Sequence, residues 1–285
     1  MQIQDPGEIY RGSRFDWTGQ VVQVVYKKKH TFCTAEEESP SSLAVLGQGI
    51  YNEFGIDQPV GYEECEPSGL FHKIGVGLLQ KQGNSPYHFQ YPYRIIPGEI
   101  KLEESAQGIS WKLEGRPVNG YAYSFRKRIQ LEPSGFTIAY SLQNTGSKGI
   151  ETSEYVHNFL SINKRRPGPG YRLIFSFDLQ HGLFGETVNP GEVVNLGKNE
   201  VGWKSVPEAA FFFSEIGPPG LHNASWELQH MDEHTGIRET VDFPVLRVNL
   251  WGCGHVVSPE VFYAISLLPG ESCRWKRTYE LLDLS

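Results

Sequence analysis

Two side chains in this sequence have the chemistry of an acid–base pair, although they lie far apart along the chain. His157 sits in a segment that alternates apolar side chains, so Tyr155, His157 and Phe159 are expected on one face of a strand. Glu260 follows Ser258 and a proline. The pKa values of imidazole and carboxyl groups can be tuned towards neutrality, which suits both to proton transfer. A histidine bonded to the backbone and a solvated loop glutamate are the structural alternatives.

Two other groups of polar residues do not predict a metal site. His230 and His234 are four residues apart in HMDEH, a spacing that brings two ligands to one face only on a helix. Here the segment joins a strand to a Thr-Gly turn and is interpreted as a hairpin loop. The four cysteines form no CxxC pair. WGCGH, Cys253 to His255, is a glycine-rich loop that can form part of a pocket wall. No metal or other cofactor is expected.

Composition and charge exclude some classes of partner. The 285 residues carry a formal net charge of −7, and each of the densest basic segments, Lys27 to Lys29 and Lys164 to Arg166, has only three residues. Nucleic acid is not expected as a partner, because backbone binding needs a concentrated cationic surface. The segment from Met1 to Tyr10 has no apolar run typical of a signal peptide. No stretch approaches the roughly 20 apolar residues that cross a membrane. We expect a cytoplasmic protein with reduced thiols and no membrane contact; its oligomeric state is not predicted.

Strand patterns and turns dominate the chain. Ser124 to Leu131 and Phe136 to Leu142 flank the turn Glu132-Pro133-Ser134-Gly135, which predicts a hairpin. Two short segments, Thr34 to Glu38 and Ser205 to Ala210, are the only helix candidates. The sequence therefore predicts an all-β fold, a large antiparallel β-sandwich, as one domain over residues 1–285. Further strands are expected at Val21 to Tyr26, Ile100 to Leu102, Ile109 to Leu113, Arg172 to Phe177, Val193 to Leu196, Ala209 to Phe213, Ser225 to His230, Val245 to Trp251, Phe262 to Leu267 and Arg274 to Leu281.

Three segments resemble the aldose 1-epimerase (galactose mutarotase-like) superfamily, in the order found there. TSEYVHNFLSIN, Thr152 to Asn163, is similar to the family's TNHxYFNL strand, and the preceding FTIAYSLQNTGSKGIET resembles its lead-in. ISLLPGESCRWKRTY, Ile265 to Tyr279, resembles the terminal strand pair around a PGE turn. SPE, Ser258 to Glu260, lies where the family has its basic glutamate. The resemblance covers most of the chain and implies a divergent member with the mutarotase-like supersandwich fold.

The binding motifs of that family are altered here. GQGIYNEFG has Asn52 near the family's NRI motif but Glu53 where the arginine would stand, and there is no LHGG. GLFHKIGVG resembles the HGFxR segment of glucose-6-phosphate epimerases, with Lys73 in place of the arginine. His72 and His88 are candidates for the missing histidine. Arg14 and Asp16, in RGSRFDW, are interpreted as a structural pair with each other.

The resemblance implies an isomerase that interconverts the anomers of a free sugar or sugar derivative. Glu260 would remove the proton of the anomeric hydroxyl and His157 would protonate the ring oxygen, with the two groups expected on opposite sides of the ring. Trp251 is the candidate aromatic platform for a sugar ring, with Trp226 and the run Tyr87 to Phe89 as weaker candidates. Two alternatives remain open: a non-catalytic carbohydrate-binding sandwich, and a lyase or hydrolase on the same fold.

Overall fold

Two large antiparallel sheets make up most of the computed structural model, which describes residues 1–106 and 108–285. Within these residues the smaller sheet has eight strands in the order β1-β2-β5-β13-β22-β21-β18-β15, and the larger has ten in the order β16-β17-β14-β19-β20-β23-β12-β11-β10-β9. The smaller sheet comprises β1 (Gln2–Gln4), β2 (Gln20–Gln23), β5 (Ile50–Phe54), β13 (Ile150–Asn158), β15 (Thr187–Val188), β18 (Phe211–Phe213), β21 (Val245–Cys253) and β22 (Val256–Leu267). The larger comprises β9 (Ile100–Ser105), β10 (Gly108–Val118), β11 (Tyr121–Glu132), β12 (Gly135–Asn144), β14 (Tyr171–Phe175), β16 (Val194–Leu196), β17 (Glu200–Trp203), β19 (Ser225–His230), β20 (Thr235–Val241) and β23 (Ser272–Asp283).

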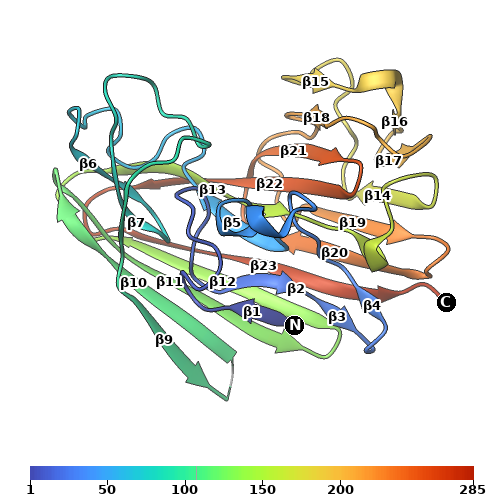
Figure 1. Ribbon diagram of the computed structural model, residues 1–285, viewed down its shortest axis with the longest axis horizontal. Coiled ribbons are helices and arrows are strands. Elements are labelled where there is room, and N and C mark those ends of the chain that lie inside the picture. Colours follow the sequence, from blue (N-terminus) through green and yellow to red (C-terminus); the bar gives the residue numbers. More distant parts are fainter. Residues whose placement is uncertain (107) are drawn as a thin grey trace.

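Smaller elements lie at the two ends of the long strands. A three-stranded sheet, β6 (Leu70–Lys73), β7 (Gly77–Gln80) and β8 (Ile95–Pro97), lies at the end opposite β15 to β18 (Figure 1). The pair β3 (Val25–Tyr26) and β4 (His30–Thr31) forms a further ribbon. The described helices are short 3₁₀ turns at Pro40–Ala44, Ile162–Lys164 and Pro190–Glu192. Among the described residues, no helix is long and apolar enough to cross a membrane.

The predicted all-β sandwich is confirmed, and so is the hairpin of β11 and β12. Glu132 pairs with Gly135 at its turn, and a Cβ at Gly135 would lie 1.9 Å from the carbonyl oxygen of Tyr279 on the neighbouring strand. His230 and His234 flank the tight turn between β19 and β20, as expected of a hairpin loop. All four cysteines have free thiols.

Both helix predictions were wrong. Residues 34–38 form bends and one isolated bridge, and residues 205–210 form bends that lead into β18 at Phe211. Ala35 forms an isolated bridge with Gln48, and the Glu36 amide donates to the carbonyl oxygen of Gly47. Long-range pairing has therefore overridden a weak local preference.

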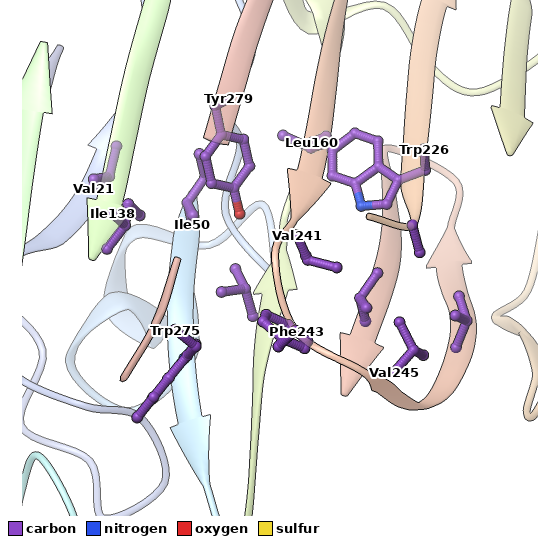
Figure 2. Packing of buried hydrophobic residues seen from close by; sticks show 14 of the residues in the cluster. Val21, Ile50, Ile138, Leu160, Trp226, Val241, Phe243, Val245, Trp275 and Tyr279 are labelled. Atoms are coloured by element: carbon purple, nitrogen blue, oxygen red, sulfur yellow. The ribbon is translucent and has the colours of Figure 1, made fainter. Parts of the chain in front are cut away.

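The hydrophobic core fills the space between the two sheets. Figure 2 shows buried side chains from both of them, among them Ile50 of the smaller sheet and Ile138, Trp226 and Tyr279 of the larger one. Trp226, a weaker candidate for the sugar platform, is fully buried in this core, where its indole N–H donates to Glu239. It belongs to the packing between the sheets.

Strand β22 lies in the middle of the smaller sheet and carries both Pro259 and Glu260. The strand expected here began only at Phe262, and a solvated loop was the structural alternative for Glu260. The structure continues the strand through it, from Val256 to Leu267. Since side chains alternate along a strand, Val257 and Val261 enter the core while Glu260 faces the other way.

Candidate functional site

The outer face of the smaller sheet forms the floor of a cavity of about 540 Å³. Alternation along each strand produces this floor, because residues between those in the core point outwards. Outward side chains on the floor are Tyr155 and His157 from β13, Glu260 and Phe262 from β22, Arg247, Asn249 and Trp251 from β21, and Phe212 from β18. Loops supply the walls: Arg14, Glu36, Ile56, Asp57, Phe89, Gln90, Glu186, Ser214 and Glu215.

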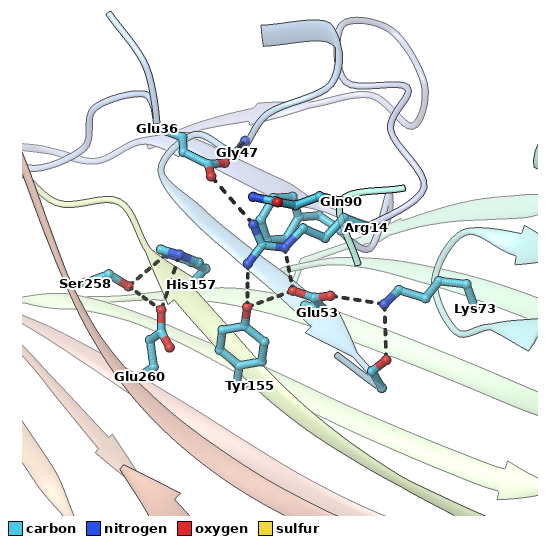
Figure 3. A network of polar contacts seen from close by, with 12 residues as sticks. Arg14, Glu36, Gly47, Glu53, Lys73, Gln90, Tyr155, His157, Ser258 and Glu260 are labelled. Atoms are coloured by element: carbon cyan, nitrogen blue, oxygen red, sulfur yellow. Dashed lines mark hydrogen bonds and ion pairs between the residues drawn. The ribbon is translucent and has the colours of Figure 1, made fainter. Parts of the chain in front are cut away.

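His157 and Glu260 lie next to each other on this floor. Their strands are neighbours, and Nε2 of His157 is 3.2 Å from Oε1 of Glu260 (Figure 3). The hydroxyl of Ser258 lies 2.9 Å from Nδ1 of His157 and donates to Oε1 of Glu260 across 3.3 Å. The three side chains form one hydrogen-bonded cluster. The acid and base candidates are therefore on the same side of the cavity, not on opposite sides of a bound ring as the sequence analysis expected.

Burial sets the charge of this pair. His157 is 4% exposed and Glu260 is 5% exposed. Loss of hydration raises the pKa of Glu260 to about 8, although Arg14 and the Ser258 hydroxyl oppose the rise. Loss of hydration, together with Arg14, holds the pKa of His157 well below its usual value. At neutral pH the pair thus carries one transferable proton, on the carboxyl group of Glu260, and His157 is a neutral imidazole.

Aromatic rings hold the imidazole in a fixed orientation. His157 stacks on Phe159, with ring centroids 4.0 Å apart and an interplanar angle of 8°. Trp251 meets His157 edge-on at 5.1 Å and also lines the cavity. Phe15 contacts both His157 and Phe159 through T-shaped pairs. The expected face of Tyr155, His157 and Phe159 is present, and Trp251 stands beside it.

A buried charge cluster flanks the acid–base pair, and we call Arg14, Glu53, Lys73 and Tyr155 the wall cluster. Nε of Arg14 donates to Oε2 of Glu53 across 2.7 Å, and Nη2 donates to the Tyr155 hydroxyl across 2.9 Å. The Tyr155 hydroxyl in turn donates to Oε2 of Glu53, and Nζ of Lys73 lies 3.1 Å from Oε1 (Figure 3). The Arg14 guanidinium packs 4.4 Å from the ring centroids of Phe15 and Phe89, so it is held from several directions.

The wall cluster keeps Glu53 charged. Burial opposes the ionised form, but Arg14 and Lys73 outweigh it and lower the pKa of Glu53. Burial raises the pKa of Tyr155 well above its usual value, so its hydroxyl stays protonated and can donate. Arg14 therefore faces the cavity in a fixed position, which depends on the carboxylate of Glu53 behind it.

Of the six residues predicted to bind substrate, only Trp251 lines the cavity; Phe89, from the weaker platform candidates Tyr87 to Phe89, lines it as well. Glu53 and Lys73 are fully buried behind Arg14, and Asn52 points into the core, where it bonds to Glu154 and Tyr140. His72 is buried against the carbonyl oxygen of Tyr121, and burial lowers its pKa to about 4. His88 stacks on Phe89 outside the cavity lining. These five side chains are therefore not placed for direct contact with a molecule in the cavity.

The sequence did not place Arg14 in the cavity, nor did it indicate Asp57, Arg247 or Asn249. The expected partner of Arg14, Asp16, instead binds Lys127 and Thr18 in the core, while Arg14 turns outwards to Glu53. Side chains two residues apart share a face only in an extended chain, whereas residues 13–15 form a bend. Cys253 and His255 contact each other at 3.7 Å but do not line the cavity.

Comparisons with known proteins establish the fold. No protein-family model matches the sequence, and no curated protein is similar to it. A galactose mutarotase-like protein from Clostridium acetobutylicum superposes with a TM-score of 0.56 at 11% identity, over 94% of this chain and 90% of that one. One from Lactobacillus casei gives 0.53 at 12% identity, over 96% and 99%. An aldose epimerase homologue from C. elegans gives 0.50 at 8% identity, over 82% of both chains. The chain thus has the galactose mutarotase-like sandwich fold, which it shares with these proteins at only 8–12% sequence identity.

Proposed function

We propose that this protein interconverts the anomers of a free, uncharged sugar, with Glu260 as the base and His157 as the acid. The observation that carries this proposal is the contact between two buried proton carriers, 3.2 Å apart, on the floor of a cavity beside an aromatic ring. The fold relationship makes a sugar the natural ligand, since two of the structural relatives are described as mutarotase-like and a third as an aldose epimerase homologue.

The geometry of the pair suits the chemistry of ring opening. The anomeric hydroxyl and the ring oxygen are bonded to the same carbon, so adjacent side chains can serve both oxygens. The base takes the hydroxyl proton as C1 and O1 form a carbonyl bond, the bond from C1 to the ring oxygen breaks, and the acid protonates that oxygen. Rotation about the C1–C2 bond and reclosure give the other anomer, and the two protons return to their original carriers.

The single proton of the pair is compatible with these roles. At neutral pH it rests on Glu260, and its transfer to His157 gives a carboxylate and an imidazolium without changing the total number of protons. Arg14 and Ser258 both favour the carboxylate form of Glu260. The proposed roles therefore begin with this transfer, which makes Glu260 the base and His157 the acid.

The charges around the cavity favour an uncharged sugar over a sugar phosphate. Both arginines of the lining are already paired, Arg14 with Glu53 and Arg247 with Asp57 across 2.6 Å. Lys73, which the sequence suggested for a phosphate, is fully buried behind Glu53. The carboxylates on the lining outnumber its two arginines: Glu36, Asp57, Glu186 and Glu215, besides Glu260. An anionic group would meet a negative potential there.

An NMR measurement of anomer exchange across a panel of aldoses tests the proposal. We expect acceleration for at least one neutral sugar and a loss of about 10²- to 10⁴-fold in kcat for His157→Asn and for Glu260→Gln. We also expect kcat/KM to fall as pH rises through about 8, because the pair then loses its only proton. Full activity in both variants would reject the assignment, and sugar binding without acceleration would instead identify a binding protein.

A further inference from the structure

The ladder between β13 and β22 is interrupted beside Glu260. Regular pairing ends at Tyr155 and Phe262 and resumes only at the isolated bridge between Leu160 and Val257. Pro259 lies in this gap and has no N–H to donate across it. Strand β22 therefore lacks regular backbone hydrogen bonds to β13 beside Glu260, where the position of the carboxyl group must be well defined.

Side chains from inside the sandwich replace the missing ladder bonds. Nδ2 of Asn158 donates to the carbonyl oxygen of Pro259 across 2.8 Å, and Nη2 of Arg277 donates to that of Val261 across 2.9 Å. These two carbonyl groups belong to the residues on either side of Glu260. The backbone of Glu260 is thus held on both sides by donors that do not touch the cavity lining.

Side chains of both sheets hold these two donors, and we call Asn158, Arg277, Tyr279, Glu154 and Glu239 the inter-sheet cluster. Arg277 projects from β23 and binds Glu154 of β13 across 2.7 Å and Glu239 of β20 across 3.0 Å. The Tyr279 hydroxyl, also on β23, donates to Oδ1 of Asn158 across 3.1 Å and to Glu239 across 2.8 Å. All of these side chains are fully buried. Burying charges is costly, so a cluster of this kind is weak evidence for stability alone.

We propose that Asn158 and Arg277 are positioning residues that fix the backbone of Glu260 from behind, and so set its distance from His157. The inference rests on the proposed function in assigning catalysis to that pair. A displacement of about 1 Å at a reacting group can cost on the order of 100-fold in rate. The Ser258 hydroxyl couples to the same unit, because it accepts from the backbone N–H of Asn158 across 3.0 Å and donates to Glu260.

Two variants and two matched controls test this role. Asn158→Ala removes the donor to Pro259, and Tyr279→Phe removes one hydroxyl from the same cluster with little change of volume. Tyr123→Phe is the control for the second, because Tyr123 is also fully buried but makes no described hydrogen bond to β22, Asn158 or Arg277. Thr235→Ala is the control for the first, since it likewise removes a buried side-chain donor to a backbone carbonyl oxygen, that of Leu282, and makes no described contact with β22, Asn158 or Arg277.

Two readouts separate positioning from general destabilisation. For Asn158→Ala we expect kcat for anomer exchange to fall about 10- to 100-fold while KM changes by less than about 3-fold. By ¹³C NMR titration of the Glu260 carboxyl group, we expect its pKa to fall by about one unit or more, because a loosened strand admits water. Tyr279→Phe should show the same changes in smaller size. Both controls should keep the wild-type kcat and titration, even where they unfold at lower denaturant concentration.

The outcomes distinguish this inference from the proposed function. Wild-type kcat and an unchanged Glu260 titration in folded Asn158→Ala would overturn the positioning role. If Asn158→Ala does not fold, the comparison of Tyr279→Phe with Tyr123→Phe decides in its place. If the wild-type protein accelerates no anomer exchange, the proposed function fails, and the NMR titration still shows whether Asn158 positions Glu260.

Discussion

Two buried charge clusters lie on opposite faces of the same sheet, and they differ in what a lost charge would leave behind. The wall cluster has two cations, Arg14 and Lys73, around the single carboxylate of Glu53, and it touches the cavity through Arg14 (Figure 3). The inter-sheet cluster has one cation, Arg277, between two carboxylates, and it has no contact with solvent. If the wall cluster lost Arg14, Glu53 would still be paired with Lys73 and would be close to the water of the cavity. The inter-sheet cluster has neither a second cation nor contact with solvent.

The comparison also separates two tasks that a site on a sheet must meet. The wall cluster shapes the surface that a ligand touches, because Arg14 and Tyr155 both face the cavity. The inter-sheet cluster holds backbone that the ladder leaves free, through Asn158 and Arg277. A change in the first should therefore act mainly on binding, and a change in the second mainly on stability and on the rate of the chemical step.

The largest effect is expected from removing the central cation of each cluster in turn. Arg277→Met leaves Glu154 and Glu239 buried without a cation and should cost about 3–5 kcal/mol in the free energy of unfolding. Arg14→Met leaves Glu53 paired with Lys73 and should cost only about 1–2 kcal/mol. Urea denaturation measures both, provided that the slope of the transition is unchanged. Equal losses would show that the two clusters do not differ in the way described.

The second effect concerns the sign of a carboxylate's contribution to stability. The pKa of Glu260 is about 8 in the folded protein, whereas an unfolded glutamate has a pKa of about 4.3. Between these values the folded state keeps a proton that the unfolded chain has lost, so stability falls as pH rises. Glu260→Gln should therefore be more stable than the wild type by about 4–5 kcal/mol at pH 8, and by only about 1 kcal/mol at pH 5.

Glu53→Gln provides the contrast for that measurement. The pKa of Glu53 is lowered in the folded state, so its carboxylate contributes stability that is present above the unfolded pKa and lost as pH falls. Its removal should destabilise the protein at neutral pH, opposite to Glu260→Gln. Thermal or urea unfolding at pH 5 and pH 8 gives both signs. A stabilised Glu53→Gln would mean that Arg14 and Lys73 do not favour the charged carboxylate.

The sequence was informative where the evidence was local. Period-two alternation predicted the hairpin of β11 and β12 and the shared face of Tyr155 and His157, because both follow from neighbouring residues. It failed where partners come from distant strands. Arg14 was paired with Asp16 on proximity, whereas the fold brings Glu53 to one and Lys127 to the other.

The sequence placed the strand of the candidate base too late, since it was expected to begin at Phe262 with a solvated loop as the alternative at Glu260. The central strand includes Pro259, and Asn158 and Arg277 donate to the carbonyl groups on either side of Glu260. Those donors cannot be inferred from the sequence near Glu260, since Arg277 belongs to the opposite sheet. The same long-range contacts that hid the strand also fix the position of the carboxylate.

The smallest effect on stability is expected from exposed carboxylates on the cavity wall, because they form no buried ion pair among the described residues. Glu186 and Glu215 line the cavity, are exposed, and form no ion pair among the described residues. The double variant Glu186→Gln/Glu215→Gln should change stability by less than about 0.5 kcal/mol. Because these carboxylates repel an anionic substrate, the variant should raise kcat/KM for a sugar phosphate about 3- to 10-fold at low salt. At about 0.5 M salt the increase should be much smaller, since salt screens the repulsion.

The control is the same pair of substitutions at Glu132 and Glu192, which are exposed and lie outside the cavity. It should leave kcat/KM unchanged. An increase that persists at high salt, or that the control pair reproduces, would show that rim charge does not set the preference for uncharged sugars.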